Sequence, residues 1–233
     1  MRSSTWHALG NTYVVIERCD SGPLDANGAR ELSRNADGVL EVVSSREDRV
    51  EIAIWNADGS QAELSGNGAR IAAAWLTERT GTRSIAVVVG EREVCTRVLE
   101  NGDFEQALGE FDVGSPELLD GLTFVPVSVG NPHAVVIGDP PEIERLGPFL
   151  ETHPRFPNRT NVQVVRVDKP GEVTARVWER GVGETLSSGT SAVAVAAATH
   201  GVGDVLVHFP GGDLRVRLEG GRAYLTGPAE RVA

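Results

Sequence analysis

The sequence predicts an α+β protein of two pseudo-symmetric halves, each a mixed β-sheet or barrel wrapped around a central helix. The first observation is an internal repeat, in which Trp55 and Ser65 recur as Trp178 and Ser188 at a common offset of 123 (178 − 55 and 188 − 65). The second is a long series of short β-branched segments with few helical ones. A period near half the chain length implies two similar halves, because the repeats of a solenoid are far shorter.

A further pair of landmarks lies upstream of each copy. Asn11 ends Leu9-Gly10-Asn11 and Asn131 ends Val129-Gly130-Asn131, and each triplet leads into an apolar run, at an offset of 120 (131 − 11). A site built from two equivalent loops approaches a small molecule from both sides. That is the geometry which a two-base reaction at a carbon centre needs.

Short β-branched runs bounded by Gly, Asp, Asn or Ser predict strands in both halves. In the first half they cover 13–17, 39–43, 50–55, 85–89 and 94–99. In the second half they cover 124–129, 134–137, 162–167, 173–178, 205–209, 214–218 and 223–225.

Two segments predict the central helices. Residues 66–80 are Ala-rich, with Ile71, Ala74 and Trp75 spaced for one buried face. Residues 189–199 are almost wholly small and apolar, and a helix that is apolar all round is buried. Peripheral helices are expected over 25–33 and 140–150.

The chain of 233 residues is long enough for two domains of roughly 110 residues. Turn residues over 113–122 mark the crossing. We therefore expect an N-terminal half over 1–118, joined by the tail 223–233, and a C-terminal half over 119–222.

Composition excludes several classes of partner. A net charge of −11 disfavours nucleic acid and anionic membrane surfaces. No apolar run approaches the ~18 residues of a membrane span, and the start of the chain lacks the pattern of a signal peptide, so a cytoplasmic protein is expected. Cys19 and Cys95 are too few for a disulfide framework and lack metal-ligand spacing, so no metal is expected.

Ser65 and Ser188 lie where a Gly-rich turn opens a buried helix. Serine is a preferred N-cap, which explains most such positions without any chemistry. Two similar sites at matching offsets favour a function, because a helix start leaves unpaired N–H groups and a partial positive charge that suit a carboxylate. The residues expected to approach that carboxylate are Gly66, Asn67, Gly189 and Thr190.

Other polar residues are candidates for binding the rest of a ligand. The asparagines are Asn11, Asn56, Asn131 and Asn161, each of which is equally well explained by turn chemistry. Glu179 suits an ammonium and Arg180 a carboxylate, although a solvated ion pair explains both as well. His133 is the best-placed histidine.

At this point the residues resemble the diaminopimelate epimerase family. The first signature loop matches the stretches 56–60 and 62–70, and the second matches 178–186 with Ser188-Gly189-Thr190. Shorter matches are 7–11, 130–133, 159–162 and 225–230. Together they span nearly the whole chain.

The resemblance implies cofactor-free epimerisation at the α-carbon of an amino acid, in a cleft between the halves, and a place in lysine biosynthesis. The positions of Ser65 and Ser188 would be catalytic, one group removing the proton and the other returning one on the opposite face. Substrate would be bound by Asn11, Asn56, Asn131, Asn161, Glu179 and Arg180, with the α-carboxylate at Gly66, Asn67, Gly189 and Thr190. A homodimer is left open.

The sequence departs from the family at the catalytic pair, where the family has cysteine and this chain has Ser65 and Ser188. A thiol has a pKa near ~8.5, whereas a hydroxyl starts near the ~15.7 of water. Those roughly seven units are on the order of 10 kcal/mol in reaching the anion. A helix dipole supplies at most about 2 kcal/mol.

Three explanations fit this departure. The chain is a Cys-to-Ser variant made to trap a ligand; or a natural paralogue that uses another base, such as Glu184, His133 or a bound water; or a protein that binds an amino acid without turning it over. A related alternative is an isomerase like those of the phenazine-biosynthesis branch of the same fold, which use a carboxylate. Smaller departures favour a natural paralogue, namely Thr12 for Asp, Ser191 for Gly and a short segment before 36–38.

Overall fold

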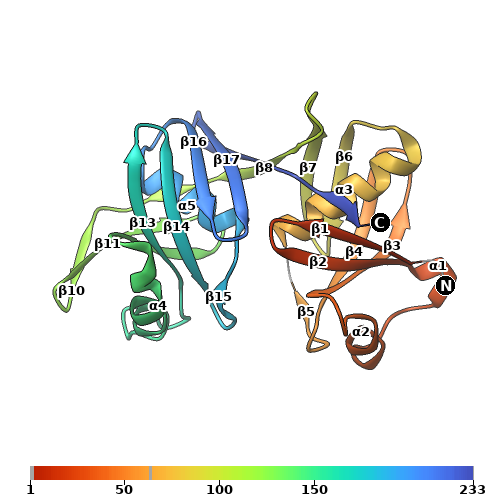
Figure 1. Cartoon of the computed structure of the whole chain (residues 1–233), viewed down its shortest axis with the longest axis horizontal. Helices are drawn as coiled ribbons and strands as arrows, with labels where there is room; N and C mark the ends of the chain where they lie inside the picture. The colour runs from red at the N-terminus through yellow and green to blue at the C-terminus, as the bar shows by residue number, and fades with distance from the viewer. Residues whose placement is uncertain (1–2, 63–64, 233) are drawn as a thin grey trace. The chain divides into compact units, whose positions relative to one another are not determined.

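The computed structural model describes residues 3–62 and 65–232. Contacts divide the chain into two compact units, one of Met1–Gln106 with Gly227–Ala233 and the other of Ala107–Thr226 (Figure 1). The domain boundaries expected from the sequence, 1–118 with 223–233 and 119–222, remain a proposal.

The first unit alternates strands with two short helices and one long one. Its elements are β1 (Ser3–Ala8), β2 (Asn11–Glu17), α1 (Arg18–Ser21), α2 (Ala26–Leu32), β3 (Gly38–Ser45), β4 (Arg49–Asn56), β5 (Gln61–Ala62), α3 (Gly66–Thr80), β6 (Ser84–Val89), β7 (Arg92–Val98), β8 (Phe104–Glu110, on the unit boundary) and β19 (Glu230–Val232). The last strand, β19, pairs antiparallel with β1, with Thr5 opposite Val232.

The second unit repeats this style. Its elements are β9 (Asp112–Val113), β10 (Glu117–Leu119), β11 (Leu122–Ser128), β12 (Pro132–Ile137), η1 (Pro140–Glu142), α4 (Ile143–Glu151), β13 (Asn161–Lys169), β14 (Glu172–Glu179), β15 (Gly183–Thr185), α5 (Gly189–Thr199), β16 (Gly203–Phe209), β17 (Gly212–Glu219) and β18 (Arg222–Gly227).

The strand pairing of the first unit recurs in the second. Strand β2 runs parallel to β3, β3 antiparallel to β4, β4 antiparallel to β5 and parallel to β6. Strands β12, β13, β14, β15 and β16 pair in the same senses. Trp55 lies opposite Val39 and Gln61, and Trp178 lies opposite Val162 and Glu184, so each partner is also offset by 123. The two pseudo-symmetric halves predicted from the repeat are therefore confirmed.

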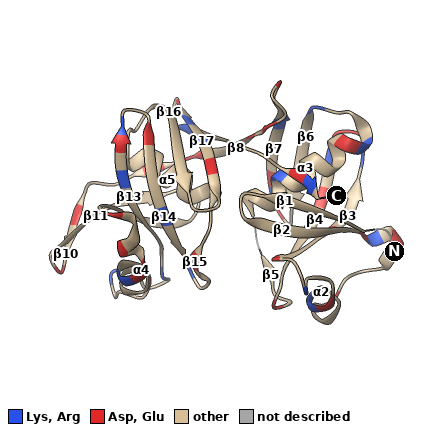
Figure 2. Ribbon diagram, viewed as in Figure 1, with Lys and Arg blue, Asp and Glu red and all other residues tan. Residues whose placement is uncertain are grey.

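Each unit buries one helix against its own strands, as the sequence predicts for 66–80 and 189–199 (Figure 1). Helix α3 is buried from Asn67 to Leu76. Helix α5 carries no charged residue and is tan throughout in Figure 2. Alanine allows this close packing because its side chain adds little volume and loses no rotamer entropy.

The peripheral helices pack on the strands of their own units, α2 on β3 and β4, and α4 on β13 and β14. Helix α2 starts at Asp25, whose Oδ1 accepts a 2.8 Å hydrogen bond from the Gly28 amide. Helix α4 packs against Trp178, and an added Cβ at Gly147 would lie 2.7 Å from the indole ring. Only glycine fits that contact.

Candidate functional site: two equivalent helix starts

The start of α3 is capped by Ser65. Its backbone is extended (φ −137°, ψ 121°), and its Oγ accepts a 3.0 Å hydrogen bond from the Gly68 amide. The Tyr13 hydroxyl lies 3.5 Å from the same oxygen. An added Cβ at Gly68 would come within 3.2 Å of the Ser65 Cβ, so glycine permits the tight turn. Residues 63 and 64 of the signature loop lie outside the described residues.

Two of the expected binding residues meet at this start. Asn67 donates from Nδ2 to Oδ1 of Asn11 at 2.6 Å, and the guanidinium of Arg70 donates to Oδ1 of Asn67. Asn56 is engaged elsewhere, because its Nδ2 donates to Oγ of Ser60 at 2.9 Å in the turn after β4.

The start of α5 is built differently. Ser188 has the same extended backbone, but among the described residues its side chain makes no cap hydrogen bond. Its hydroxyl instead hydrogen-bonds Glu179 at the end of β14, which also accepts a 2.6 Å bond from Thr185. Burial raises the pKa of Glu179, and the two hydroxyl donors only partly oppose that rise. A desolvated carboxylate of raised pKa has the chemistry of a general base.

A chain of buried polar groups orients Asn131. Gln163 donates from Nε2 to Nδ1 of His133 at 3.0 Å and to Oγ of Ser191 at 2.9 Å. The other ring nitrogen of His133 lies 2.9 Å from Oδ1 of Asn131, whose Nδ2 lies 3.5 Å from Oγ1 of Thr190. Burial lowers the pKa of His133 to about 3, so the ring is neutral and both its nitrogens are occupied.

The remaining expected residues have backbone partners. Asn161 donates to the Pro132 carbonyl at 2.9 Å and accepts from the Arg180 amide at 3.0 Å. The Arg180 side chain is exposed, with the Asn158 carbonyl 3.4 Å away. Asn161 therefore joins the first residue of β12 to the residue that follows β14.

Glu184, weighed above as a base, faces away from Ser188. It is opposite Trp178 in the β14–β15 pair, whereas Thr185 is opposite Val177 and bonds Glu179. Side chains alternate between faces of a sheet. Arg176 holds the Glu184 carboxylate in two hydrogen bonds of 2.6 and 2.7 Å.

Sequence reasoning missed four residues that contact the candidate groups. They are Tyr13, Arg70, Gln163 and Thr185. One signal was available for Tyr13, because it is 120 residues before His133 and each begins the parallel pairing with the next strand of its unit. Arg70 and Thr185 were present only as parts of the signature stretches 62–70 and 178–186.

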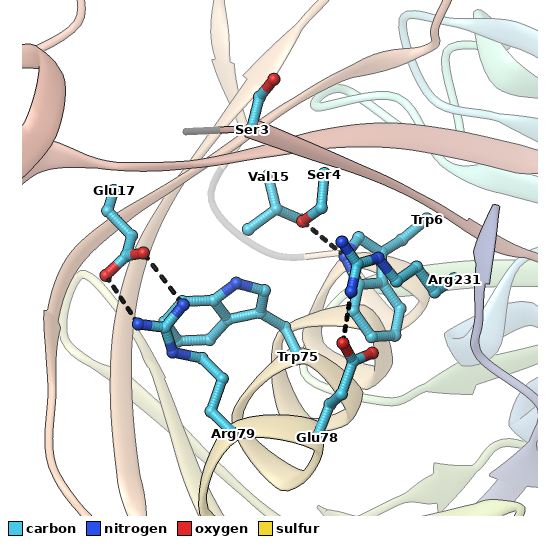
Figure 3. A pocket seen from close by; sticks show the side chains of 9 residues that line it. All are labelled: Ser3, Ser4, Trp6, Val15, Glu17, Trp75, Glu78, Arg79 and Arg231. Atoms are coloured by element: carbon cyan, nitrogen blue, oxygen red, sulfur yellow. Dashed lines mark hydrogen bonds and ion pairs between the residues drawn. The ribbon is translucent and has the colours of Figure 1, made fainter. Parts of the chain in front are cut away.

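A cavity of about 500 Å³ lies elsewhere in the first unit, beside the last turn of α3 (Figure 3). Arg79 lies over the Trp75 ring, 4.6 Å from its centroid, and pairs with Glu17. This is the end of α3 opposite Ser65, about 20 Å along the helix. The charged side chains that line it are engaged in ion pairs, since Arg231 also pairs with Glu78.

The described ranges 3–62 and 65–232 contain no group of three His, Cys, Asp or Glu side chains that could hold a metal ion. In the same ranges no helix is long and apolar enough to cross a membrane.

Comparison with known proteins gives consistent results. The family model described as diaminopimelate epimerase matches residues 4–118 and 125–232. A diaminopimelate epimerase of Desulfitobacterium hafniense is 35% identical over 266 aligned residues, covering 97% of this chain and 94% of that protein. Another, of Methanothermobacter thermautotrophicus, is 34% identical and covers 98% and 96%. Since this chain has 233 residues, at least 33 of the 266 aligned positions are gaps in it.

Solved structures share the fold at low identity. A predicted epimerase from Pseudomonas aeruginosa has a TM-score of 0.72 at 17% identity, covering 100% of this chain and 97% of its own. A phenazine biosynthesis protein of the PhzF family from Bacillus anthracis has a TM-score of 0.73 at 15% identity, covering 100% and 98%. A hydroxyproline epimerase from Agrobacterium vitis has a TM-score of 0.67 at 14% identity, covering 99% and 89%. By its family model and by its near-full-length relatives, the chain belongs to the diaminopimelate epimerase family.

Proposed function

We propose that the protein is a cofactor-independent epimerase that inverts the α-carbon of an amino acid, with diaminopimelate as the expected substrate. The observation that carries this proposal is the equivalence of two helix starts, one in each unit, with Ser65 and Ser188 at the N-cap. Each start offers backbone N–H groups and a partial positive charge to a carboxylate. A cytoplasmic location and a role in lysine biosynthesis are part of the same proposal.

Proton transfer in this chain needs a base other than a free serine alkoxide. We assign that role at the second start to Glu179, whose carboxylate hydrogen-bonds the Ser188 hydroxyl. A carboxylate removes a carbon-bound proton more readily than a serine hydroxyl does, because the basic form of serine is the alkoxide, which is far less accessible than a carboxylate, and a raised pKa makes the carboxylate a stronger base. At the first start, Ser65 and the adjacent Tyr13 hydroxyl are the groups available to return a proton.

The substrate contacts are assigned from the position of each side chain and from the donors and acceptors that its described hydrogen bonds leave. Asn11, Asn67, Asn131 and Thr190 are assigned to the substrate, because they meet at the two helix starts. Asn56, Asn161 and Arg180 keep the assignment that the resemblance implies, and Asn161 has a second Nδ2 hydrogen and a second Oδ1 lone pair left. Gly66 and Gly189 let a carboxylate approach the backbone.

Two alternatives are supported by particular observations. The carboxylate beside Ser188 favours a phenazine-biosynthesis-type isomerase that uses Glu179 as its base. Hydroxyls at both catalytic positions favour a protein that binds an amino acid without turnover, since the serine anion is on the order of 10 kcal/mol less accessible than a thiolate.

Deuterium wash-in at the α-carbon separates these functions. An epimerase incubated with meso-diaminopimelate in heavy water exchanges the α-proton, which mass spectrometry detects as a gain of one mass unit, and LL-diaminopimelate accumulates. Glu179→Gln is the matched control, because it keeps the shape and removes the base. Thermal stabilisation by diaminopimelate without exchange would establish a binding protein. Exchange that survives Glu179→Gln would contradict the assignment of the base.

A further inference from the structure

Arg70 is a buried cation whose described hydrogen-bond partners are all neutral. Its side chain is fully buried in the second turn of α3. It donates to Oδ1 of Asn67, to Oε1 of Gln106 at 3.1 Å and to the Pro228 carbonyl at 3.4 Å. Burial lowers its pKa to about 10, and the charge of Asp103 raises it only in part, so the guanidinium stays protonated at neutral pH.

No carboxylate among the described residues lies within the 4.0 Å of an ion pair with Arg70. A buried arginine is usually paired, because an isolated charge is costly to desolvate. Its contacts are therefore with amide and carbonyl dipoles, and the charge of Asp103 acts on it from beyond ion-pair distance.

Gln106 occupies a position at which a carboxylate would form an ion pair with Arg70. Its side chain is fully buried on β8 and its Oε1 accepts from Arg70, while its Nε2 has no hydrogen-bond partner in the described part of the chain. A glutamate of nearly the same shape would pair with Arg70 and would remove the unpartnered N–H group. Changing the Gln106 amide to a carboxylate would neutralise the charge of Arg70. With glutamine at this position, the guanidinium has no described carboxylate in contact.

The charge of Arg70 lies close to the start of α3, and α5 has no equivalent charge at its own start. Side chains on a helix tilt toward its N-terminus, and Arg70 reaches back to Asn67, which in turn bonds Asn11. The equivalent position of α5, offset by 123, is Val193, which is also fully buried.

We infer that Arg70 is a positioning residue for carboxylate binding at the start of α3, where it fixes the Asn67 amide and adds to the charge of the helix a positive charge that has no described carboxylate in ion-pair contact. This inference rests on the proposed function for its ligand, the carboxylate of an amino acid. Because Val193 replaces the cation in α5, the start of α3 is the more electropositive of the two.

The test neutralises the charge without removing an atom from the core. In Gln106→Glu the new carboxylate pairs with Arg70, so we expect an unchanged or higher melting temperature together with a roughly tenfold higher KM for meso-diaminopimelate. Gln106→Met is the matched control, because it also removes the amide but leaves the charge. It should lower the melting temperature and leave KM within about twofold. A merely structural Arg70 would give KM unchanged in both variants.

A second readout needs no turnover. In a Ser65→Cys background, the alkylation rate of the introduced thiol by iodoacetamide follows its thiolate fraction. We expect Gln106→Glu to slow it about tenfold at pH 7, equal to one pKa unit. Within the described ranges, Tyr13 is a further ionisable group placed against this position, and it is the same in both variants. Peptide mass spectrometry reads the site separately from Cys19 and Cys95, and the rate at exposed Cys19 is the internal control.

The two readouts distinguish the inference from the proposed function. A slowed thiol with no diaminopimelate binding by the parent would support the role of Arg70 and overturn the proposed substrate. Normal α-proton exchange by the parent, with neither KM nor thiol reactivity altered in a folded Gln106→Glu variant, would overturn the role of Arg70. If Gln106→Glu fails to fold, Arg70→Lys tests the positioning role by itself, since it keeps the charge and loses the contact with Asn67. A KM within twofold of the parent would then refute positioning.

Discussion

Gln163 donates a hydrogen bond of 3.0 Å to Nδ1 of His133 and thereby fixes which ring nitrogen carries the proton. The proton must lie on Nε2, which donates to Oδ1 of Asn131 at 2.9 Å. Asn131 is held with its Nδ2 toward Thr190 at the start of α5. His133 therefore acts on the site by orienting an amide, and its neutral ring is unsuited to removing a proton.

This arrangement predicts the pH dependence of stability. The pKa of His133 is about 3 in the folded protein, against about 6.5 when unfolded. Between these values the unfolded chain binds the extra proton, so the stability that neutral His133 provides is complete above about pH 6.5 and is lost as the pH falls toward 3. We expect urea unfolding at pH 5, 6 and 7 to show a slope of up to about 1.4 kcal/mol per pH unit that His133→Asn removes.

His208 is the control, because its pKa is shifted in the opposite direction to that of His133. Hydrogen bonding to Asp213 raises its pKa, so its contribution is present below the ordinary value and is lost as the pH rises through the raised one. His208→Gln should leave the acid-side slope in place. Parallel pH curves for the parent and His133→Asn would contradict a neutral His133.

The two serines should differ in what they contribute to stability. Ser65 accepts from the Gly68 amide, whereas no described group in the first turn of α5 donates to Ser188. Ser65→Ala should therefore cost about 1 kcal/mol of unfolding free energy, the usual value of a lost cap. Ser188→Ala should cost less, since it removes only one of the two described hydroxyl donors to Glu179. Equal losses in urea titrations of the two variants would show that the helix starts are equivalent in energy as well as in position.

Gly147 should be irreplaceable for a steric reason. A Cβ there would lie 2.7 Å from the indole ring of Trp178, which is rigid and packed. Gly147→Ala should destabilise the protein by about 1–3 kcal/mol, even though alanine favours a helix. Gly28→Ala in α2 is the control, because its Cβ would meet the flexible end of Leu24 at 2.9 Å and that side chain can move. A lower melting temperature for Gly28→Ala than for Gly147→Ala would refute this explanation.

The sequence was sufficient for the elements with a strong local pattern. Helices α3 and α5 follow from their small apolar residues, and the offset of 123 carries over to the strand partners of Trp55 and Trp178. Strand β1 was missed because Ser3–Ala8 has no β-branched run and is held by pairing with β2 and β19. Tertiary context decides such strands more than propensity does.

The candidate site was only partly predictable for the same reason. Serine at a helix start predicts a cap, which is right for Ser65, but Ser188 hydrogen-bonds Glu179 at the end of β14 instead. Gln163 and Arg70 lie inside ordinary strand and helix patterns, and nothing local marks their contacts with His133 and Asn67. Their roles depend on which elements pack together.

The final prediction concerns the catalytic positions themselves. Ser65→Cys combined with Ser188→Cys introduces groups about seven pKa units more acidic while changing side-chain size little. The double variant should epimerise diaminopimelate faster than a slow parent does, as measured by deuterium wash-in. Each single variant should gain much less, because one thiol removes a proton but cannot return one on the other face. A double variant that binds diaminopimelate and stays inert would place the obstacle beyond the hydroxyls, with Glu179→Gln as the next change to measure.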